Sequence, residues 1–308
     1  MRIDNVAIPG TVGTLPSTVC TRDGLTLALR HWPSLLTPRP SGIVCIVHGL
    51  GEHIGRYEHV AQNLNQAGWA VVGYDLRGHG KSDGARGAIN KDDDLLHDLA
   101  TVIDAIKLAY STHRLALLGH SLGGLVVARF AAAHANPLEH AAWRRSMDLC
   151  VLSSPALKIS LNTIQLCLLN SVGRLAPNLT VANGLNPEWI STDASVVKAY
   201  VNDPLVHNRV TGRLTRFMLE SAKTVRQRAF NWTTPTLLLY SGADRCVRPE
   251  GSRQFSASVP ASLIQSKEYA QMAHEIFNEA DREMVFNDLQ GWLAMFADFG
   301  IRQFGALG

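Results

Sequence analysis

The stretch at residues 115–124 constrains the fold of this chain most strongly, because an apolar run turns sharply there into a second apolar run. A Gly-x-Ser-x-Gly motif occupies residues 119–123, at the turn itself. A strand that turns so tightly into a helix leaves room only for very small side chains two residues before and after the serine. Glycine meets that demand because it has no Cβ to collide with the neighbouring backbone. The motif predicts a strand–turn–helix unit that presents Ser121 as a catalytic nucleophile.

Apolar runs on both sides of this unit predict a mostly parallel sheet. Residues 18–32 predict an antiparallel hairpin around the turn pair Asp23-Gly24. Continuous apolar runs, typical of strands buried on both faces, occur at 42–47, 69–74, 149–152 and 235–240, with a last strand expected at 263–269. Helical periodicity separates them, at 57–67, 95–106, 122–134 and 282–299. We therefore expect an α/β fold with an eight-stranded sheet flanked by helices.

The strand pattern is interrupted between residues 156 and 232. No β-branched run of strand type appears there, and the apolar pattern is helical and broken by prolines. Connections between neighbouring strands are normally short, so a long periodic segment indicates an inserted helical cap. We divide the chain into a first part of the core at 1–154, the cap at 155–232 and a second part of the core at 233–308.

Two features of the cap bear on what it contacts. Apolar residues at helical spacing form a stripe: Leu161, Ile164, Leu168, Leu169, Val172 and Leu175. Packing onto the core is the simplest interpretation, but such a stripe could also line a hydrophobic pocket or touch a membrane or micelle surface transiently. Basic residues dominate the second half: Arg209, Arg213, Arg216, Lys223, Arg226 and Arg228. A solvated helix face explains such a row more often than a site for anionic lipids does.

Two further residues are candidates to activate Ser121. A serine hydroxyl is too weak an acid to attack an ester unaided, so an imidazole must take its proton and a carboxylate must orient that imidazole. Asp244 follows the expected strand at 235–240, and His274 follows the one at 263–269. The order Ser, Asp, His, each after a strand, is the arrangement expected of an α/β-hydrolase. We predict that these three residues form a catalytic triad.

Other acids and histidines are weaker candidates for the same roles. Asp281 competes with Asp244 but falls at the final helix, and His79 and His120 compete with His274. His120 lies on the elbow beside the nucleophile, where its ring is expected to point away from the required side. The histidines lack a metal-ligand spacing such as His-Glu-x-x-His, and no metal or cofactor is expected.

A tetrahedral intermediate needs two hydrogen-bond donors for its oxyanion. One is expected to be the backbone N–H of Leu122, at the positive end of the helix that follows Ser121. The other is expected in the loop after the strand at 42–47, at the N–H of Leu50. Glycines on both sides of Leu50 let the backbone approach a substrate closely. A glycine-rich turn with a packing role only is the alternative.

Composition excludes several classes of protein. The net charge of +3 over 308 residues is too small to indicate a nucleic-acid partner. The five cysteines are odd in number and never paired as Cys-x-x-Cys, so neither a disulfide framework nor a thiolate metal site is expected.

The Gly-Lys-Ser at 80–82 lacks the earlier glycine of a phosphate-binding loop, and the acids at 92–94 are expected to cap a helix. The sequence shows neither a signal peptide nor a spanning segment, which makes the cytoplasm the expected location.

Several motifs in combination resemble one enzyme family. They are His-Gly-Leu-Gly-Glu-His at 48–53, Gly-Arg-Tyr at 55–57, Asp-x-Arg-Gly-His-Gly-x-Ser at 75–82, Gly-His-Ser-Leu-Gly-Gly at 119–124 and Ala-Tyr-x-x-Asp-Pro-Leu at 199–205. With these motifs the chain is similar, from about Thr18 to Trp292, to the monoacylglycerol lipase and lysophospholipase branch of the α/β-hydrolases. The resemblance implies a serine hydrolase that cuts single-chain acyl esters, with the triad and oxyanion positions given above.

Two other functions stay open at this point. A serine peptidase of the same architecture that removes N-terminal residues would need acids in the cap to hold a substrate ammonium group. The cap offers only Glu188, Asp193, Asp203 and Glu220. A non-catalytic binding protein on the same fold would not need an intact Ser, Asp and His set. We therefore expect an esterase or lipase that forms an acyl-enzyme on Ser121, with a small-molecule acyl ester as its substrate.

Overall fold

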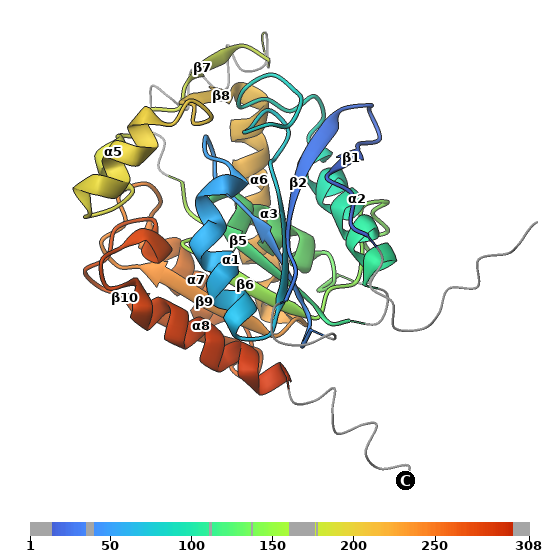
Figure 1. Ribbon diagram of the computed structural model, residues 1–308, viewed down its shortest axis with the longest axis vertical. Helices are drawn as coiled ribbons and strands as arrows, with labels where there is room; N and C mark the ends of the chain where they lie inside the picture. Colours follow the sequence, from blue (N-terminus) through green and yellow to red (C-terminus); the bar gives the residue numbers. More distant parts are fainter. Residues whose placement is uncertain are drawn as a thin grey trace, which may run out of the picture.

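An eight-stranded sheet forms the centre of the protein (Figure 1). The computed structural model describes residues 14–34, 40–110, 113–136, 138–159, 176 and 178–297. The strands are β1 (Thr18–Cys20), β2 (Thr26–Trp32), β3 (Ile43–Val47), β4 (Ala70–Tyr74), β5 (Leu115–His120), β6 (Leu149–Ser153), β9 (Thr236–Ser241) and β10 (Ile264–Tyr269). Their order in the sheet is β1-β2-β4-β3-β5-β6-β9-β10. The pairs from β4 to β10 are parallel, and β1 and β2 pair antiparallel, so the expected sheet and hairpin are confirmed.

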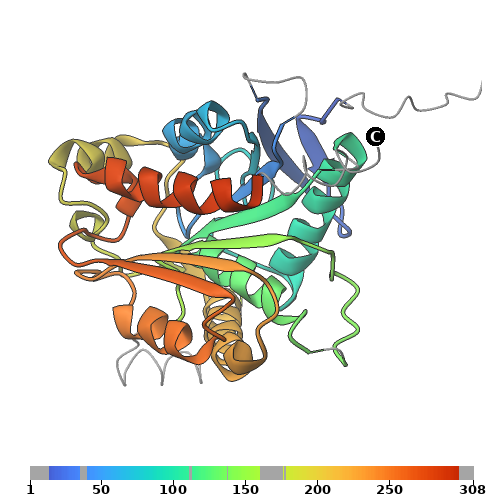
Figure 2. The same ribbon diagram turned by 90° about the horizontal axis from the view of Figure 1, so that it is seen from below.

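Helices cover both faces of the sheet, because each buried strand alternates its side chains between two apolar cores. In β3, for example, Val44 and Ile46 contribute to one core, whereas Cys45 and Val47 contribute to the other. The first core lies under α1 (Glu58–Gln66) and α8 (Arg282–Ala297). The second lies under α2 (Asp94–Ala109), α3 (Leu122–Ala132), α6 (Gly212–Arg228) and α7 (Pro249–Ser258), on the opposite side of the sheet (Figure 2). Short 3₁₀ turns complete the described elements: η1 (Ile54–Tyr57), η2 (Pro187–Trp189), η3 (Ala229–Asn231) and η4 (Ile276–Asn278).

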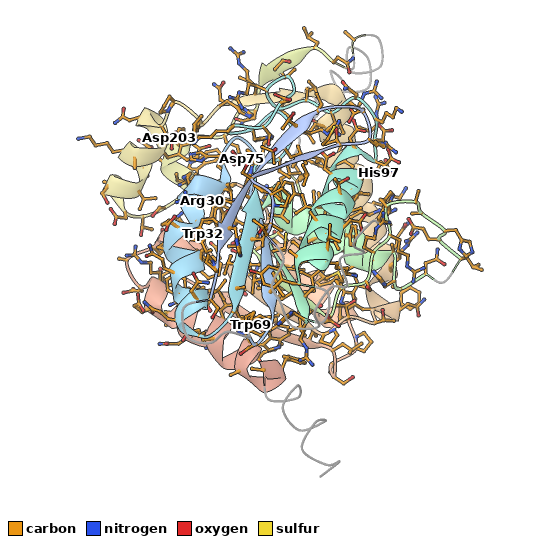
Figure 3. All side chains as sticks on the ribbon, turned by 45° about the vertical axis from the view of Figure 1, so that its right-hand side comes forward. Arg30, Trp32, Trp69, Asp75, His97 and Asp203 are labelled. Carbon is orange, nitrogen blue, oxygen red and sulfur yellow. The ribbon has the colours of Figure 1, made fainter. Side chains whose placement is uncertain are left out.

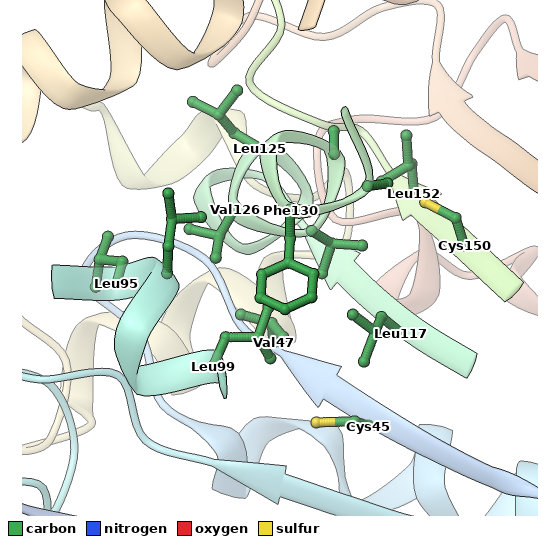
Figure 4. Packing of buried hydrophobic residues seen from close by; sticks show 14 of the residues in the cluster. Cys45, Val47, Leu95, Leu99, Leu117, Leu125, Val126, Phe130, Cys150 and Leu152 are labelled. Atoms are coloured by element: carbon green, nitrogen blue, oxygen red, sulfur yellow. The ribbon is translucent and has the colours of Figure 1, made fainter. Parts of the chain in front are cut away.

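Phe130 of α3 shows how the second core is packed (Figure 4). Its fully buried ring lies among Leu99 of α2, Val47 of β3 and Leu117 of β5. The ring centroid of Trp143 is 5.4 Å away. Burying a side chain of this size stabilises the fold by about 1.5–3 kcal/mol. This packing holds α3 against the strand that it follows, and so holds the turn that carries Ser121.

The segment between β6 and β9 is less purely helical than expected. It contains a two-stranded antiparallel ribbon, β7 (Thr180–Ala182) with β8 (Arg209–Thr211), and the helix α5 (Ala194–Asn202). These elements lie at one end of the sheet (Figure 1), whereas α6 contributes Leu214 and Phe217 to the second core and packs against α3. The predicted apolar stripe at 161–175 lies outside the described residues. The division of the chain at residues 154 and 232 stays a prediction.

A buried ion cluster lies between the hairpin and α2. The side chain of Arg77 is almost fully buried and pairs with Asp23, Asp94 and Asp98. Asp94 also accepts hydrogen bonds from the backbone N–H groups of residues 90 and 91. The acids at 92–94 therefore have a structural role, but Asp94 acts by binding Arg77 and the preceding loop, which differs from the expected helix cap. Among the described helices, none combines the length and the apolar character needed to span a bilayer.

Candidate active site

Ser121 lies in the strained turn between β5 and α3. Its φ of 52° and ψ of −115° fall in a region that residues other than glycine rarely adopt. Three backbone hydrogen bonds of 3.0 Å hold this conformation: the Ser121 N–H donates to the Ser153 carbonyl, and the Ser121 carbonyl accepts from the N–H groups of Leu125 and Ala156. The side chain is partly exposed. The fold therefore presents a rigidly held serine to solvent.

Gly119 and Gly123 meet the steric demand that the motif predicts. A Cβ on Gly119 would lie 2.4 Å from the Gly123 carbonyl oxygen, and a Cβ on Gly123 would lie 2.0 Å from the Val47 carbonyl oxygen. Real Cβ atoms essentially never come closer than 3.0 Å to such atoms. Because both residues are glycine, β5 and α3 can meet in a sharp turn and α3 can lie directly on the end of β3.

Asp244 and His274 form a hydrogen-bonded pair at the same edge of the sheet. They follow β9 and β10, which are neighbouring parallel strands. His274 Nδ1 donates to Asp244 Oδ2 at 2.6 Å, and the other carboxylate oxygen accepts from the N–H groups of Cys246 and Val247 at 2.8 and 2.9 Å. Since Nδ1 carries the proton in this pair, Nε2 of the neutral ring can accept one.

The electrostatic surroundings of His274 favour its protonated form. Burial alone would lower the pKa of His274, but the neighbouring Asp244 carboxylate outweighs it and holds that pKa above the ordinary histidine value. The ring of His120 lies 4.7 Å from that of His274, centroid to centroid. Burial and the neighbouring His274 lower the pKa of His120 to about 3, so His120 stays neutral. The expectation that His120 points away from this side is wrong, because its ring packs against His274.

Ser121 and His274 both adjoin His120, the former in sequence and the latter through ring packing. Within the described residues, no hydrogen bond joins Ser121 Oγ to His274. Contacts between a nucleophile and its base are often long without substrate and shorten in the reacting complex. The structure thus brings Asp244 and His274 into direct contact and places Ser121 in the same cluster.

The two predicted oxyanion donors belong to segments that adjoin Ser121. Leu122 is the first residue of α3, where a backbone N–H has no acceptor within the helix. The loop after β3 passes beside the serine, because a Cβ on Gly49 would lie 3.2 Å from the Ser121 Cβ. Leu50 follows Gly49 directly and is partly exposed. The loop that carries Leu50 and the first turn of α3 therefore both adjoin the serine, and the role of the two N–H groups as donors stays a prediction.

A buried ion network that the sequence does not predict adjoins these loops. Arg56 donates to Glu52 at 2.7 Å and, through two nitrogens, to both carboxylate oxygens of Glu275 at 2.6 and 2.7 Å. We call Glu52, Arg56 and Glu275 the ion bridge. The motifs at 48–53 and 55–57 contain two of these residues, but no local pattern indicates that Arg56 reaches Glu275, the residue after His274.

The segment between β6 and β9 contacts this end of the sheet through polar groups. His53 Nε2 pairs with Asp203 at 2.8 Å, and the N–H of His207 donates to the Gly51 carbonyl at 2.8 Å. Asp203 lies after α5 and Asp75 after β4, and Figure 3 shows both at the same end of the molecule. The motif residues at 48–53 and 199–205 therefore meet in space and join the segment after α5 to the loop that carries Leu50.

A cavity of about 390 Å³ lies between η2, α5 and the loop before β8. Ile190, Tyr200, Val206 and His207 are among its lining residues. Tyr200 and His207 also lie beside Gly51, so the cavity adjoins the loop after β3. A second cavity of about 520 Å³ lies against η2 and α5 and shares Val201 with the first, and none of the predicted triad residues is among the residues that line either cavity.

Asp244, Cys246 and His274 present potential ligand atoms within 4.8 Å of one another. The Asp244 carboxylate already accepts three hydrogen bonds, one of them from His274. Burial raises the pKa of the Cys246 thiol, and the adjacent Asp244 raises it further, so the thiol stays protonated. Because Asp244 and His274 are already paired with each other, this group of side chains fits an acid–base pair.

Known proteins resemble this chain over most of its length. A family model described as serine aminopeptidase, S33, matches residues 38–281. A monoacylglycerol lipase from Mycolicibacterium smegmatis is 33% identical over 257 residues, which cover 82% of this chain and 88% of the relative. A phospholipase from Bacillus subtilis is 31% identical over 252 residues, 80% of this chain and 93% of the relative. The crystal structure of a monoacylglycerol lipase from Paleococcus ferrophilus has a TM-score of 0.75 at 33% identity, covering 88% of this chain and 99% of that one.

Proposed function

The chain belongs to the serine aminopeptidase S33 family of α/β-hydrolases and to its monoacylglycerol lipase-like branch, and from this premise we propose that it cleaves esters of single-chain lipids. It is a serine carboxylic ester hydrolase. The proposed substrates are monoacylglycerols or lysophospholipids; the monoacylglycerol lipase relative supports the first class, and the phospholipase relative supports a substrate with a phospholipid headgroup. The cavity beside Gly51 supports this proposal, because its lining mixes apolar residues such as Ile190 with polar ones such as Tyr200.

The proposed mechanism assigns one role to each predicted site residue. Ser121 Oγ attacks the ester carbonyl carbon while His274 Nε2 takes the hydroxyl proton, and Asp244 stabilises the imidazolium that forms. The N–H groups of Leu50 and Leu122 donate to the oxygen that becomes negative. His274 then gives the proton to the leaving alcohol, and an acyl-enzyme remains on Ser121. Water, deprotonated by His274, attacks the acyl-enzyme and releases the fatty acid.

The hydrogen bond between Asp244 and His274, beside the strained turn of Ser121, is the observation that carries this proposal. Replacing Ser121 by alanine should lower the turnover of a medium-chain p-nitrophenyl ester by about a thousandfold or more, and abolish labelling by a fluorophosphonate. The control is Ser256→Ala, which replaces a serine of α7 whose hydroxyl bonds to Ser266 at the surface. This variant should keep both the ester turnover and the fluorophosphonate labelling of the wild type. A Ser121→Ala enzyme with wild-type turnover would refute the assignment.

Cleavage of esters is favoured over removal of N-terminal residues because the acids of the cap are engaged or exposed. Asp203 pairs with His53, and Asp193 accepts hydrogen bonds from the N–H and hydroxyl of Ser195. Glu188 and Glu220 are exposed. We therefore expect measurable turnover of monoacylglycerols and little of aminoacyl-anilides. Faster cleavage of the anilides would reverse this preference.

We also propose that the cap touches a lipid surface transiently. Leu179, Val181 and Val201 are 53%, 44% and 60% exposed, and all three belong to the cap. Replacing Val181 by aspartate should weaken co-sedimentation with phospholipid vesicles, whereas Leu108→Asp on α2, where the side chain is 86% exposed, should not. Equal binding by both variants would locate the contact elsewhere.

We propose the cytoplasm as the location of the protein. The four cysteines among the described residues carry free thiols, which is typical of a reducing compartment. Fractionation of cells that express a tagged full-length chain tests this location. Recovery of the chain with secreted proteins would contradict it.

A further inference from the structure

We propose that Glu52 is a positioning residue that aims the Leu50 N–H at the oxyanion, an inference that rests on the proposed function. Glu52 Oε1 accepts a hydrogen bond of 2.6 Å from the N–H of Gly49 and another of 2.7 Å from the Tyr57 hydroxyl. Its second oxygen accepts from Arg56. Glu52 therefore fixes the loop one residue before the predicted oxyanion donor.

Two hydrogen bonds hold the backbone that leads into Leu50. The N–H of Gly49 is held by Glu52, and the carbonyl of Gly49 accepts from His48 Nδ1 at 2.8 Å. The Gly49 carbonyl and the Leu50 N–H belong to the same planar trans peptide and point in opposite directions. The hydrogen bond that fixes the Gly49 carbonyl therefore also fixes the direction of the Leu50 N–H. Glycine at position 49 has no side chain to pack, and hydrogen bonds must supply the restraint. Glu52 supplies it on one side of Gly49, and His48 on the other.

The ion bridge joins this loop to the loop of the catalytic base. Arg56 contacts Glu52 with one nitrogen and grips Glu275 with two. Glu275 follows His274, and its own N–H donates to the Ile190 carbonyl of the cap at 2.7 Å. The Arg56 guanidinium therefore links the loop that carries the predicted donor Leu50 to the loop that carries His274.

A contribution to the stability of the fold does not by itself explain why the buried residues Glu52 and Glu275 are charged. Glu52 and Glu275 are 3% and 5% exposed, yet apolar residues of similar size often serve a fold as well as a buried ion pair does. Although burial opposes it, the Arg56 guanidinium holds the pKa of Glu52 at about 2. Glu52 is therefore ionised, and a carboxylate accepts a stronger hydrogen bond from a backbone N–H than a neutral group does.

The test compares Glu52→Ala and Glu52→Gln with a matched variant far from Ser121. Glu139→Gln is that control, because Glu139 is a partly buried acid that, like Glu52, pairs with arginine, in this case with Arg129 and Arg228. For each enzyme, active sites are titrated with a fluorophosphonate, and kcat and KM are measured per titrated site on a monoacylglycerol. The affinity of an alkyl boronic acid is measured too, because its tetrahedral adduct on Ser121 carries an oxygen that stands in for the oxyanion.

We expect kcat of Glu52→Ala to fall about 100-fold per titrated site, with KM nearly unchanged, since the lost restraint acts in the transition state. Boronic acid affinity should fall with kcat/KM, and Glu52→Gln, which keeps an acceptor but loses the charge, should lie between the alanine variant and the wild type. Glu139→Gln should lose thermal stability but keep kcat per site.

Wild-type kcat and boronic acid affinity in either Glu52 variant would overturn the inference, whatever the melting temperature. A loss of activity that equals the loss of titratable sites would do the same, because it would mean that Glu52 serves folding only. If Glu52→Ala does not fold, the glutamine variant decides the question. Failure of the proposed function is recognised separately, by a wild-type enzyme that neither reacts with the fluorophosphonate at Ser121 nor cleaves the ester.

Discussion

Replacing Gly123 by alanine tests whether the close packing of α3 on β3 sets the geometry of the site. The new Cβ would lie 2.0 Å from the Val47 carbonyl oxygen and 2.4 Å from that of His48. A carbon and a carbonyl oxygen normally stay about 3.3 Å apart, so α3 and the end of β3 must separate by about 1.3 Å. The N–H of Leu122 lies on one side of this contact and that of Leu50 on the other. A misplacement of about 1 Å can cost 100-fold in rate, and we expect kcat/KM to fall by about that factor.

The same overpacking should lower the free energy of unfolding by about 1–3 kcal/mol, which differential scanning calorimetry would record as a melting point lower by several degrees. Ester hydrolysis per fluorophosphonate-titrated site measures the rate. Gly291→Ala is the matched control, because nothing lies within 4 Å of a Cβ at this exposed position of α8. Its kcat/KM should not change, and its stability should rise by up to about 1 kcal/mol. A Gly123→Ala enzyme with kcat/KM within about twofold of the wild type would refute the reasoning.

Two further predictions concern the base and the core. Asp244→Asn should lower kcat by about 10⁴-fold. Only neutral His274 can take a proton, so the wild-type kcat/KM should fall with decreasing pH through a pKa above the ordinary 6.5. This limb of the profile should move to lower pH in the variant, where the Asp244 carboxylate no longer counteracts burial. A pH–rate profile with an unmoved limb would contradict this. Phe130→Ala should cost about 3–5 kcal/mol in urea unfolding, and Phe230→Ala, at a 66% exposed position, about 0.5 kcal/mol or less. Equal costs would contradict the packing in Figure 4.

The parallel strands are the part of this fold that sequence predicts best. A strand buried on both faces must be apolar at every position, so the expected strand at 42–47 matches β3 (Ile43–Val47) within one residue. The motif at 119–123 predicts the end of β5 and the start of α3 equally well, because a turn this tight needs glycines at fixed positions. The edge where the candidate triad lies follows directly from these elements.

Contacts between distant segments are harder to predict, because no local pattern contains them. Arg56 and Glu275 are 219 residues apart and, in sequence, are simply two charged residues. The strands β7 and β8 have three residues each, too few for alternation to be recognisable. In α6 the row of basic residues is conspicuous, but the buried Leu214 and Phe217 between them determine where the helix packs.

The strands that sequence predicts and the loop contacts that it does not predict are held in place by different interactions. Packing on both faces fixes β5, β9 and β10, which carry Ser121, Asp244 and His274 to one edge of the sheet. The loop after β3 has glycines where side chains would otherwise pack, and hydrogen bonds to the buried Glu52 and His48 hold it instead. The apolar periodicity of the sequence shows which strands are fixed by packing, but it does not show which loops are held by hydrogen bonds. Sequence can therefore place the predicted nucleophile and its predicted partners, whereas the hydrogen bonds that hold the loop of the predicted oxyanion donor become visible only in three dimensions.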